Sequence, residues 1–383
     1  MLIGLLCLSV NAFAADGGKK EKAKTKSAAI PPKKFIDPAN MDLSVKPGDN
    51  FFEYANGTWV KNNPIPAKET RWGSFGILHQ DNTEKLLNLL AEVGKTTHPK
   101  GSLEQRVGDL YASGMDSLAI DKRGYEPIKP ALTRIDKIAD VNGVISEVIF
   151  ERTHGEGDPL FRFGVTEDSK HPTKNIAELS QGGTSLPDRD NYLKSDARTQ
   201  KIQDAYKQYI VTLFTLTGTG TDAAAKNAAT ILNIETALAK AQLSRVAMRD
   251  PHVTYNKFAV ADFSKTTPHL NWVELLPKMK IAGQDTLLVG QPDFFKAEDA
   301  LLTATPIEDW KVYLKWNILK GSSSALSAPF VKANFAFSSA LSGQKIQTPR
   351  NERISGLVDG SLGMERKIRR YYTGAIKKAW CIL

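Results

Sequence analysis

The sequence has few of the residues from which cysteine- and histidine-based sites are built. Its 383 residues include two cysteines, Cys7 and Cys381, and six histidines. With one cysteine near each end, no internal disulfide is available to the body of the chain. The histidines are at least seventeen positions apart, so no His-x-x-x-His pair occurs, and no Gly-x-Ser-x-Gly motif is present. These absences exclude the metal and nucleophile motifs that a single sequence reveals most readily.

Long apolar runs and a basic face are missing as well. After the first 14 residues no segment approaches eighteen consecutive apolar residues, so we expect no transmembrane helix. The net charge of +9 is concentrated in residues 15–34 and 364–383, which carry +5 each and leave −1 for residues 35–363. Nucleic-acid-binding domains typically cluster basic residues on one face. We therefore expect no nucleic-acid partner.

The N-terminus has the pattern of an export signal. Leu2–Val10 is apolar, and Ala12-Phe13-Ala14 matches an A-x-A cleavage site. The apolar run is too short to span a bilayer, although no Lys or Arg precedes it. We predict a signal peptide at residues 1–14, cleaved after Ala14, and export to the periplasm or the medium. Residues 15–34, rich in Lys, Ala and Pro, are expected to form a flexible linker.

From Phe35 onward, apolar residues recur mainly with the helical period. Helices are expected around 75–93, 103–111, 202–213, 225–246 and 307–318. A capping box with proline at the first helical position, Thr305-Pro306-Ile307-Glu308, is expected to begin the last of these.

Strand patterns are few. Phe161, Phe163 and Val165 alternate with polar or small residues, which predicts a half-buried strand, and residues 286–290 are a second candidate. The expected fold is mainly α, with one or two small β-hairpins.

Several segments occur together in a recognisable order. The longest are Asp42–Val60 (DLSVKPGDNFFEYANGTWV), Arg71–Phe75 (RWGSF) and Leu179–Leu193 (LSQGGTSLPDRDNYL). From the residues alone, the first predicts a turn, an aromatic cluster and a turn at Asn56-Gly57, and the third a glycine loop followed by a proline turn. Shorter ones follow: Arg249-Asp250, Tyr255-Asn256, Asn271-Trp272, Trp310, Leu314, Trp316, Phe335–Phe337, Leu341–Gly343 and Pro349-Arg350.

In this order, over about 320 residues, the segments resemble the N-terminal region of the M13 (neprilysin-like) zinc metallopeptidases. The resemblance implies that residues 35–363 form a multi-helical domain that caps the active-site chamber of an exported endopeptidase for oligopeptides. It also implies zinc in the intact enzyme, held by a His-Glu-x-x-His helix and a later Glu. That motif is absent here, so we expect no catalytic residue, no metal ligand and no activity from this chain alone.

Three places in the sequence are candidates for a metal- or substrate-binding site. His154-Gly155-Glu156-Gly157-Asp158 is interpreted as a glycine loop and not a metal site, and His79 as a surface histidine within a helix. Arg71 is the one position that the resemblance suggests for substrate binding, because a guanidinium suits the terminal carboxylate of a peptide. The alternative is an exposed residue before a helix with no ligand.

The end of the sequence departs from the family pattern. After Gly363 the family continues with a Glu-Ala-containing helix and a Tyr-Val motif, whereas residues 364–370 read MERKIRR. We interpret residues 364–383 as a divergent basic tail produced by a frameshift or truncation, with true divergence as the alternative. Two other functions stay open: a stand-alone helical module that binds peptides or proteins, and a helical scaffold unrelated to peptidases.

Overall fold

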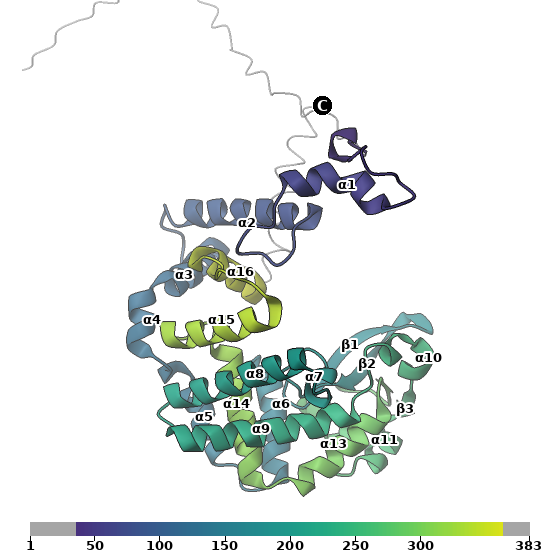
Figure 1. The fold of residues 1–383 in the computed structure, drawn as a ribbon. Coiled ribbons are helices and arrows are strands. Elements are labelled where there is room, and N and C mark those ends of the chain that lie inside the picture. The colour runs from purple at the N-terminus through teal and green to yellow at the C-terminus, as the bar shows by residue number, and fades with distance from the viewer. Residues whose placement is uncertain (1–35, 363–383) are drawn as a thin grey trace, which may run out of the picture. The chain divides into compact units, whose positions relative to one another are not determined.

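The computed structural model describes residues 36–362, which divide into a unit ending at Pro64 and a unit beginning at Ile65 (Figure 1). Residues 1–35 and 363–383, which include the expected signal peptide, the whole of the expected linker and the basic tail, lie outside the described residues. Helices dominate both units, so the prediction of a mainly α fold is confirmed. Among the described residues, no helix has both the length and the apolar character needed to cross a membrane.

The first unit consists of η1 (Pro38–Asn40) and α1 (Phe51–Asn62). Asn50 caps α1 by accepting a hydrogen bond from the amide of Glu53, at 3.1 Å. The prediction of a turn at Asn56-Gly57 is wrong, since both residues lie inside α1. Gly57 instead permits close packing, because a Cβ there would lie 2.8 Å from the Cβ of Asp42.

The second unit holds the remaining elements. Its helices are α2 (Ser74–Val93), α3 (Leu103–Met115), α4 (Ser117–Arg123), η2 (Glu126–Ile128), α5 (Lys129–Asp136), α6 (Val141–His154), α7 (Asp190–Leu193), α8 (Ala197–Leu216), α9 (Thr221–Ala241), η3 (Ala247–Arg249), α10 (Pro251–Thr254), α11 (Val260–Thr266), α12 (Trp272–Lys278), α13 (Pro292–Ala304), α14 (Ile307–Ser322), α15 (Ala328–Ser342) and α16 (Arg350–Leu362). Its strands are β1 (Phe161–Asp168), β2 (His171–Gln181), β3 (Lys257–Ala259) and β4 (Thr286–Val289).

The strands form one mixed sheet in the order β1-β2-β4-β3. The β1–β2 pair is an antiparallel hairpin, β2 and β4 are parallel, and β3 is antiparallel to β4. The two strands expected from the sequence are therefore present, but they belong to a single sheet. The expected alternation holds at Phe161 and Phe163 and fails at Val165, which is 54% exposed.

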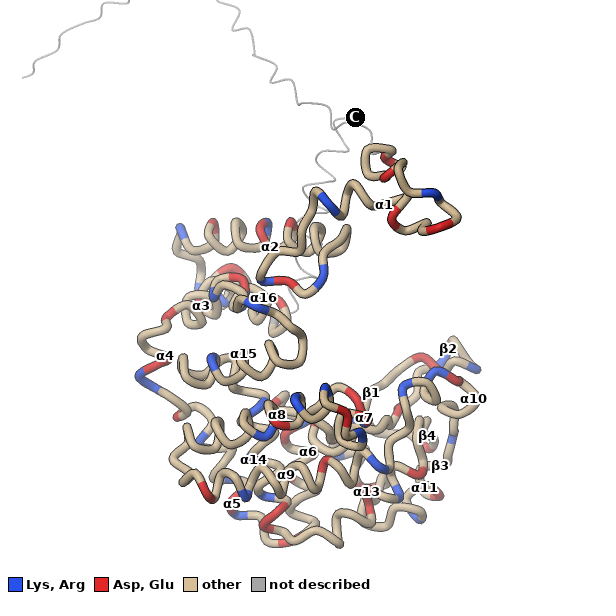
Figure 2. Tube along the Cα trace, viewed as in Figure 1, with Lys and Arg blue, Asp and Glu red and all other residues tan. Residues whose placement is uncertain are grey.

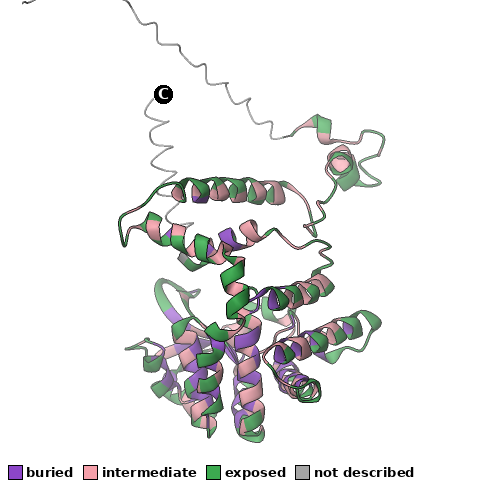
Figure 3. Ribbon diagram, turned by 90° about the vertical axis from the view of Figure 1, so that its left-hand side faces the viewer, coloured by how far each residue is buried: buried purple, intermediate pink, exposed green. Residues whose placement is uncertain are grey.

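The main core surrounds α14, which contacts α5, α6, α8 and α9. Trp310, Tyr313 and Trp316 of α14 are fully buried there. A second, smaller core joins α2, α3 and α16 through Leu90, Val107, Ile354 and Val358. Figure 3 shows buried residues concentrated in one group of helices, with far fewer elsewhere.

The expected helices are present as α2, α3, α8, α9 and α14, and several of their ends differ from the expectation. The helix expected over 225–246 is α9, which ends at Ala241, and Gln242 is extended. The capping box at Thr305 is also wrong: α14 begins at Ile307 with Pro306 as its N-cap, and no side chain caps it. Pro306 is extended, with ψ of 144°, so it precedes the helix and does not open it.

The expected glycine loop after β2 is present and has a steric reason. Gly183 has φ of +75°, and a Cβ there would lie 2.7 Å from the carbonyl oxygen of Leu160. The loop therefore lies directly against the residue that precedes β1. Charged residues of both signs are interspersed along the described chain (Figure 2), as expected for a nearly neutral body.

Candidate functional site

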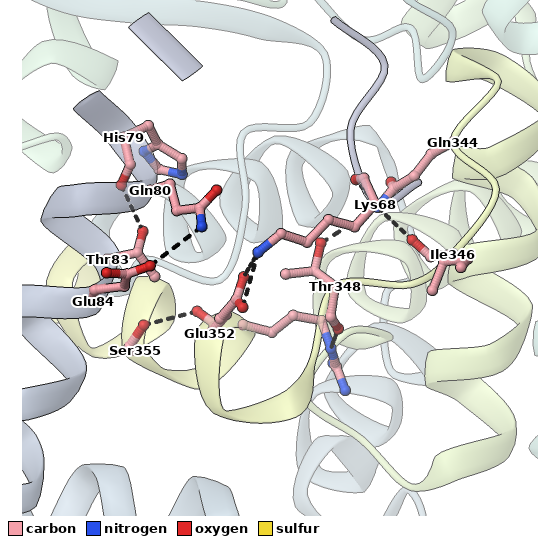
Figure 4. Close-up of polar contacts among 11 residues, drawn as sticks. Lys68, His79, Gln80, Thr83, Glu84, Gln344, Ile346, Thr348, Glu352 and Ser355 are labelled. Atoms are coloured by element: carbon pink, nitrogen blue, oxygen red, sulfur yellow. Dashed lines mark hydrogen bonds and ion pairs between the residues drawn. The ribbon is translucent and has the colours of Figure 1, made fainter. Parts of the chain in front are cut away.

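A cavity of about 810 Å³ lies in the second unit, between α2 and α16 and beside the loops that precede them (Figure 4). Its volume is in the range of small-molecule and peptide side-chain sites. Most of the residues that line it have polar side chains. The residues that supply it are Lys68–Thr70, His79, Gln80, Asn82–Leu87, Leu89, Ser342, Gln344, Thr348, Glu352, Ser355, Gly356 and Asp359.

One wall is the polar face of α2. His79, Gln80, Thr83 and Glu84 recur at helical spacing and so lie on one side of the helix. The Thr83 hydroxyl donates to the carbonyl of His79 at 2.9 Å, and the Gln80 amide donates to Glu84 Oε1 at 3.2 Å. Leu90 of the same helix is buried in the small core, and Leu86 and Leu89 both pack against that core and contribute to the cavity lining.

The opposite wall is α16. Ser355 and Gly356 follow Glu352 by three and four residues, and Asp359 follows them by four and three, so all four share a face. Ser355 is buried and donates to the carbonyl of Glu352 at 2.9 Å. On the other side of α16, Ile354 packs against Gly114 of α3, where a Cβ would lie only 2.6 Å from Ile354 Cγ2. Gly114 thus allows α16 to seat closely enough to form the wall.

A clamp closes one end of the cavity. Lys68 Nζ lies 2.9 and 2.7 Å from the two carboxylate oxygens of Glu352, and both side chains are about three-quarters buried. The Gln344 amide donates to the carbonyls of Lys68 and Ile346, each at 3.0 Å. The clamp therefore joins the segment before α2 to α16 and to the loop between α15 and α16.

The chemistry available in the cavity is that of binding. It offers carboxylates, amides, hydroxyls and one imidazole, and no cysteine or Ser-His pair suited to nucleophilic attack. Within residues 36–362, no three His, Cys, Asp or Glu side chains converge to hold a metal ion. The described residues therefore do not form the zinc site that the resemblance implies for the intact enzyme.

Arg71 lies in the loop before α2, one residue beyond the lining residue Thr70, and is exposed. It does not line the cavity itself. Its neighbour Trp72 packs over α2, where a Cβ on Gly76 would lie 2.9 Å from Trp72 Cε3. This contact anchors the backbone beside Arg71, while the role of Arg71 in substrate binding stays a prediction.

The other two candidate sites, His79 and the segment 154–158, have ordinary structural roles. His79 is an exposed helical residue at the cavity, as expected for a surface histidine. In the 154–158 segment, His154 stacks on Phe150 at 3.8 Å, Glu156 pairs with Arg134, and Asp158 pairs with Arg152 at 3.0 Å. The two carboxylates thus bind different arginines.

Sequence reasoning missed Lys68 and Glu352. They lie 284 positions apart, and neither belongs to a motif. No signal in one sequence pairs them, because only the packing of α2 on α16 brings them together.

The chain is similar to known peptidases over most of its length. Residues 47–379 match the pattern of peptidase family M13, and this range includes most of the segment 364–383. Endothelin-converting enzyme 1 of Rattus norvegicus is 28% identical over 319 residues, which cover 80% of this chain and 41% of that protein. Neprilysin-3 of Drosophila melanogaster is 27% identical over 326 residues, covering 79% and 41%.

Solved structures of metallopeptidases are also similar to this chain. The inhibitor complex of the Mycobacterium tuberculosis zinc metalloprotease Zmp1 superposes with a TM-score of 0.78 at 28% identity, covering 86% of this chain and 50% of that one. PepO of Lactobacillus rhamnosis gives a TM-score of 0.68 at 17% identity, which shows the fold alone. The chain spans about half the length, or less, of these relatives.

The clamp generates a first prediction. In a double-mutant cycle with Lys68→Ala and Glu352→Ala, we expect a coupling free energy of about 1 kcal/mol, since both side chains are largely withdrawn from water. Urea unfolding monitored by circular dichroism measures it. The exposed pair Lys265–Asp262 is the control and should give a coupling near zero. Equal couplings in the two cycles would contradict the clamp.

Proposed function

This chain belongs to peptidase family M13, and from that membership we propose that it is the non-catalytic part of a zinc metalloendopeptidase. In this proposal the helical body encloses a chamber that admits oligopeptides and excludes folded proteins. The zinc ligands and the general base lie in sequence that the relatives have and this chain does not match. Zinc is then a cofactor of the intact enzyme and is not bound by residues 36–362.

The observation that carries the proposal is the half-covered apolar face of α2. In the C-terminal half of the helix, Leu90 is buried and Leu86 and Leu89 are partly buried against α3 and α16. In the N-terminal half, Phe75 is 89% and Leu78 is 54% exposed. Large exposed apolar side chains close together mark interaction surfaces, and burying each would contribute about 1.5–3 kcal/mol. We propose that the remainder of the peptidase covers this face.

The proposed inactivity has a direct test. The purified chain, supplied with Zn²⁺ and a quenched fluorescent oligopeptide, is expected to show no cleavage above a buffer blank. It is also expected to retain no stoichiometric zinc after dialysis, because the described residues lack a convergent donor set. Cleavage that a chelator abolishes and zinc restores would refute the proposal.

A stand-alone module that binds peptides is the second candidate, and the polar cavity beside Arg71 favours it. Arg71 would then bind the terminal carboxylate of a peptide. We expect a free-acid peptide to bind about tenfold more tightly than its C-terminal amide, and Arg71→Ala to abolish that difference. Fluorescence anisotropy measures both affinities.

The matched control is Arg162→Ala, which removes another exposed arginine, on β1. It should leave the preference unchanged. If the isolated chain binds neither peptide, the stand-alone module is excluded and Arg71 can act only in the intact enzyme.

We also propose that the chain is exported and that its signal peptide is cleaved after Ala14. The support is the apolar run followed by an A-x-A site. Intact-mass spectrometry of the periplasmic or extracellular fraction is expected to show a chain that begins at Ala15. Recovery from the cytoplasm with the first 14 residues retained would contradict export.

A further inference from the structure

Buried ionisable side chains meet where α6, α9 and α14 pack together. Glu151 of α6 and Glu235 of α9 are both fully buried. Lys320 of α14 lies near both. Burial lowers the pKa of Lys320, and the charges of Glu235 and Glu151 oppose that fall. Ionised groups in such an interior need partners, because desolvation of an unpaired charge is costly.

Glu235 has its partners. Its carboxylate accepts from the hydroxyls of Ser185 at 2.6 Å and of Tyr192 and Tyr206, each at 2.8 Å. Lys320 Nζ donates to the same Ser185 hydroxyl at 2.9 Å. Burial raises the pKa of Glu235, and Lys320 and the three hydroxyls oppose that rise. Lys320 and Glu235 thus form one charge-balanced set.

Glu151 has no such partners. Neither of its carboxylate oxygens accepts a hydrogen bond from any residue of the described chain. The cation beside it on α5, Arg134, is bound to Glu147 at 2.8 and 2.9 Å and also to Glu156. Two carboxylates on one guanidinium already exceed its charge, so Arg134 offsets a charge on Glu151 only in part.

The turn after α6 is held by the same arginine, through Glu156, and by the Asp158–Arg152 ion pair. Gly155 ends α6 in the left-handed conformation, and Glu156 then pairs with Arg134. Gly157 lies against Glu151, with Oε2 3.2 Å from where a Cβ would be. A charge on Glu151 would therefore arise beside this turn and within reach of the cation that holds it.

We propose that Glu151 is a proton-dependent latch: its proton keeps Arg134 committed to Glu147 and Glu156, and loss of that proton draws Arg134 toward Glu151 and releases the turn 155–158. The step transfers one proton from the Glu151 carboxyl to solvent and needs no other reactant. The charged groups that face Glu151 are Glu147 on its own helix, Glu156 on the turn, Arg134 on α5 and Lys320 on α14.

The sign of the effect follows from burial. Desolvation, with the charges of Glu147 and Glu156, raises the pKa of Glu151 from 4.5 to about 8. The folded state therefore binds this proton more tightly than the unfolded chain does. The resulting stabilisation is complete below pH 4.5 and is lost as the pH rises through about 8. Mild acid closes the latch, and mild alkali opens it.

Hydrogen exchange tests the latch in the intact chain. After correction for intrinsic rates, amide exchange in residues 152–158 is expected to rise about tenfold between pH 6 and pH 9. Glu151→Gln, which keeps the shape and carries no charge, should hold this exchange at its low value at both pH values. Glu167→Gln, at an exposed carboxyl on β1, is the control and should behave like the unmodified chain.

A second measurement detects the protonated carboxyl group directly. The infrared band of a protonated carboxyl group should be weaker in Glu151→Gln than in the unmodified chain at pH 6, and the difference should vanish by about pH 10. Glu235 and Glu298 are also buried carboxyl groups and are present in both samples, so in a folded variant the difference isolates Glu151. An unchanged band at pH 6, or the same pH dependence of exchange in Glu151→Gln, would overturn the latch.

Discussion

Enclosure of α14 is the constraint on which the rest of the second unit depends. Its buried residues, Trp310, Tyr313 and Trp316 among them, point to more than one side of the helix, so neighbours must surround it. α5, α6, α8 and α9 do so. The polar atoms of its large side chains must then find partners inside the core. Tyr313 donates to the carbonyl of Gly183 at 2.7 Å and Trp316 to the Ser185 hydroxyl at 3.1 Å, so the glycine loop is fixed by the central helix.

The α2–α3–α16 layer is held together by different contacts. Its small core contains four buried apolar residues, too few to organise long helices alone. Close backbone approach at Gly114 and the Lys68–Glu352 pair supply further order. Part of the apolar stripe of α2 extends beyond the core that could cover it. The same layer thus contains both the polar cavity and the exposed apolar face.

The sequence predicted the parts of this structure that depend on local periodicity and failed where distant packing decides. The stripes of α2, α3 and α8 repeat over several turns and identified those helices. β2 was missed because its first five residues are all exposed and show no alternation. The Asn56-Gly57 pair has turn chemistry, yet Gly57 serves contact with Asp42 inside a helix. The cavity clamp depends on a pairing across 284 positions, which local patterns cannot report.

Buried charge in this chain marks structure more than catalysis. Perturbed carboxyl groups usually point to active sites, and Glu151, Glu235 and Glu298 are all perturbed by burial. A catalytic carboxyl must also reach a reacting atom, and none of these three lines the large cavity. Their common position is between packed helices, where a proton or a hydroxyl can replace a counter-ion. Within residues 36–362 the perturbed carboxyl groups therefore reflect the packing of helices, and no set of donors converges to hold a metal ion.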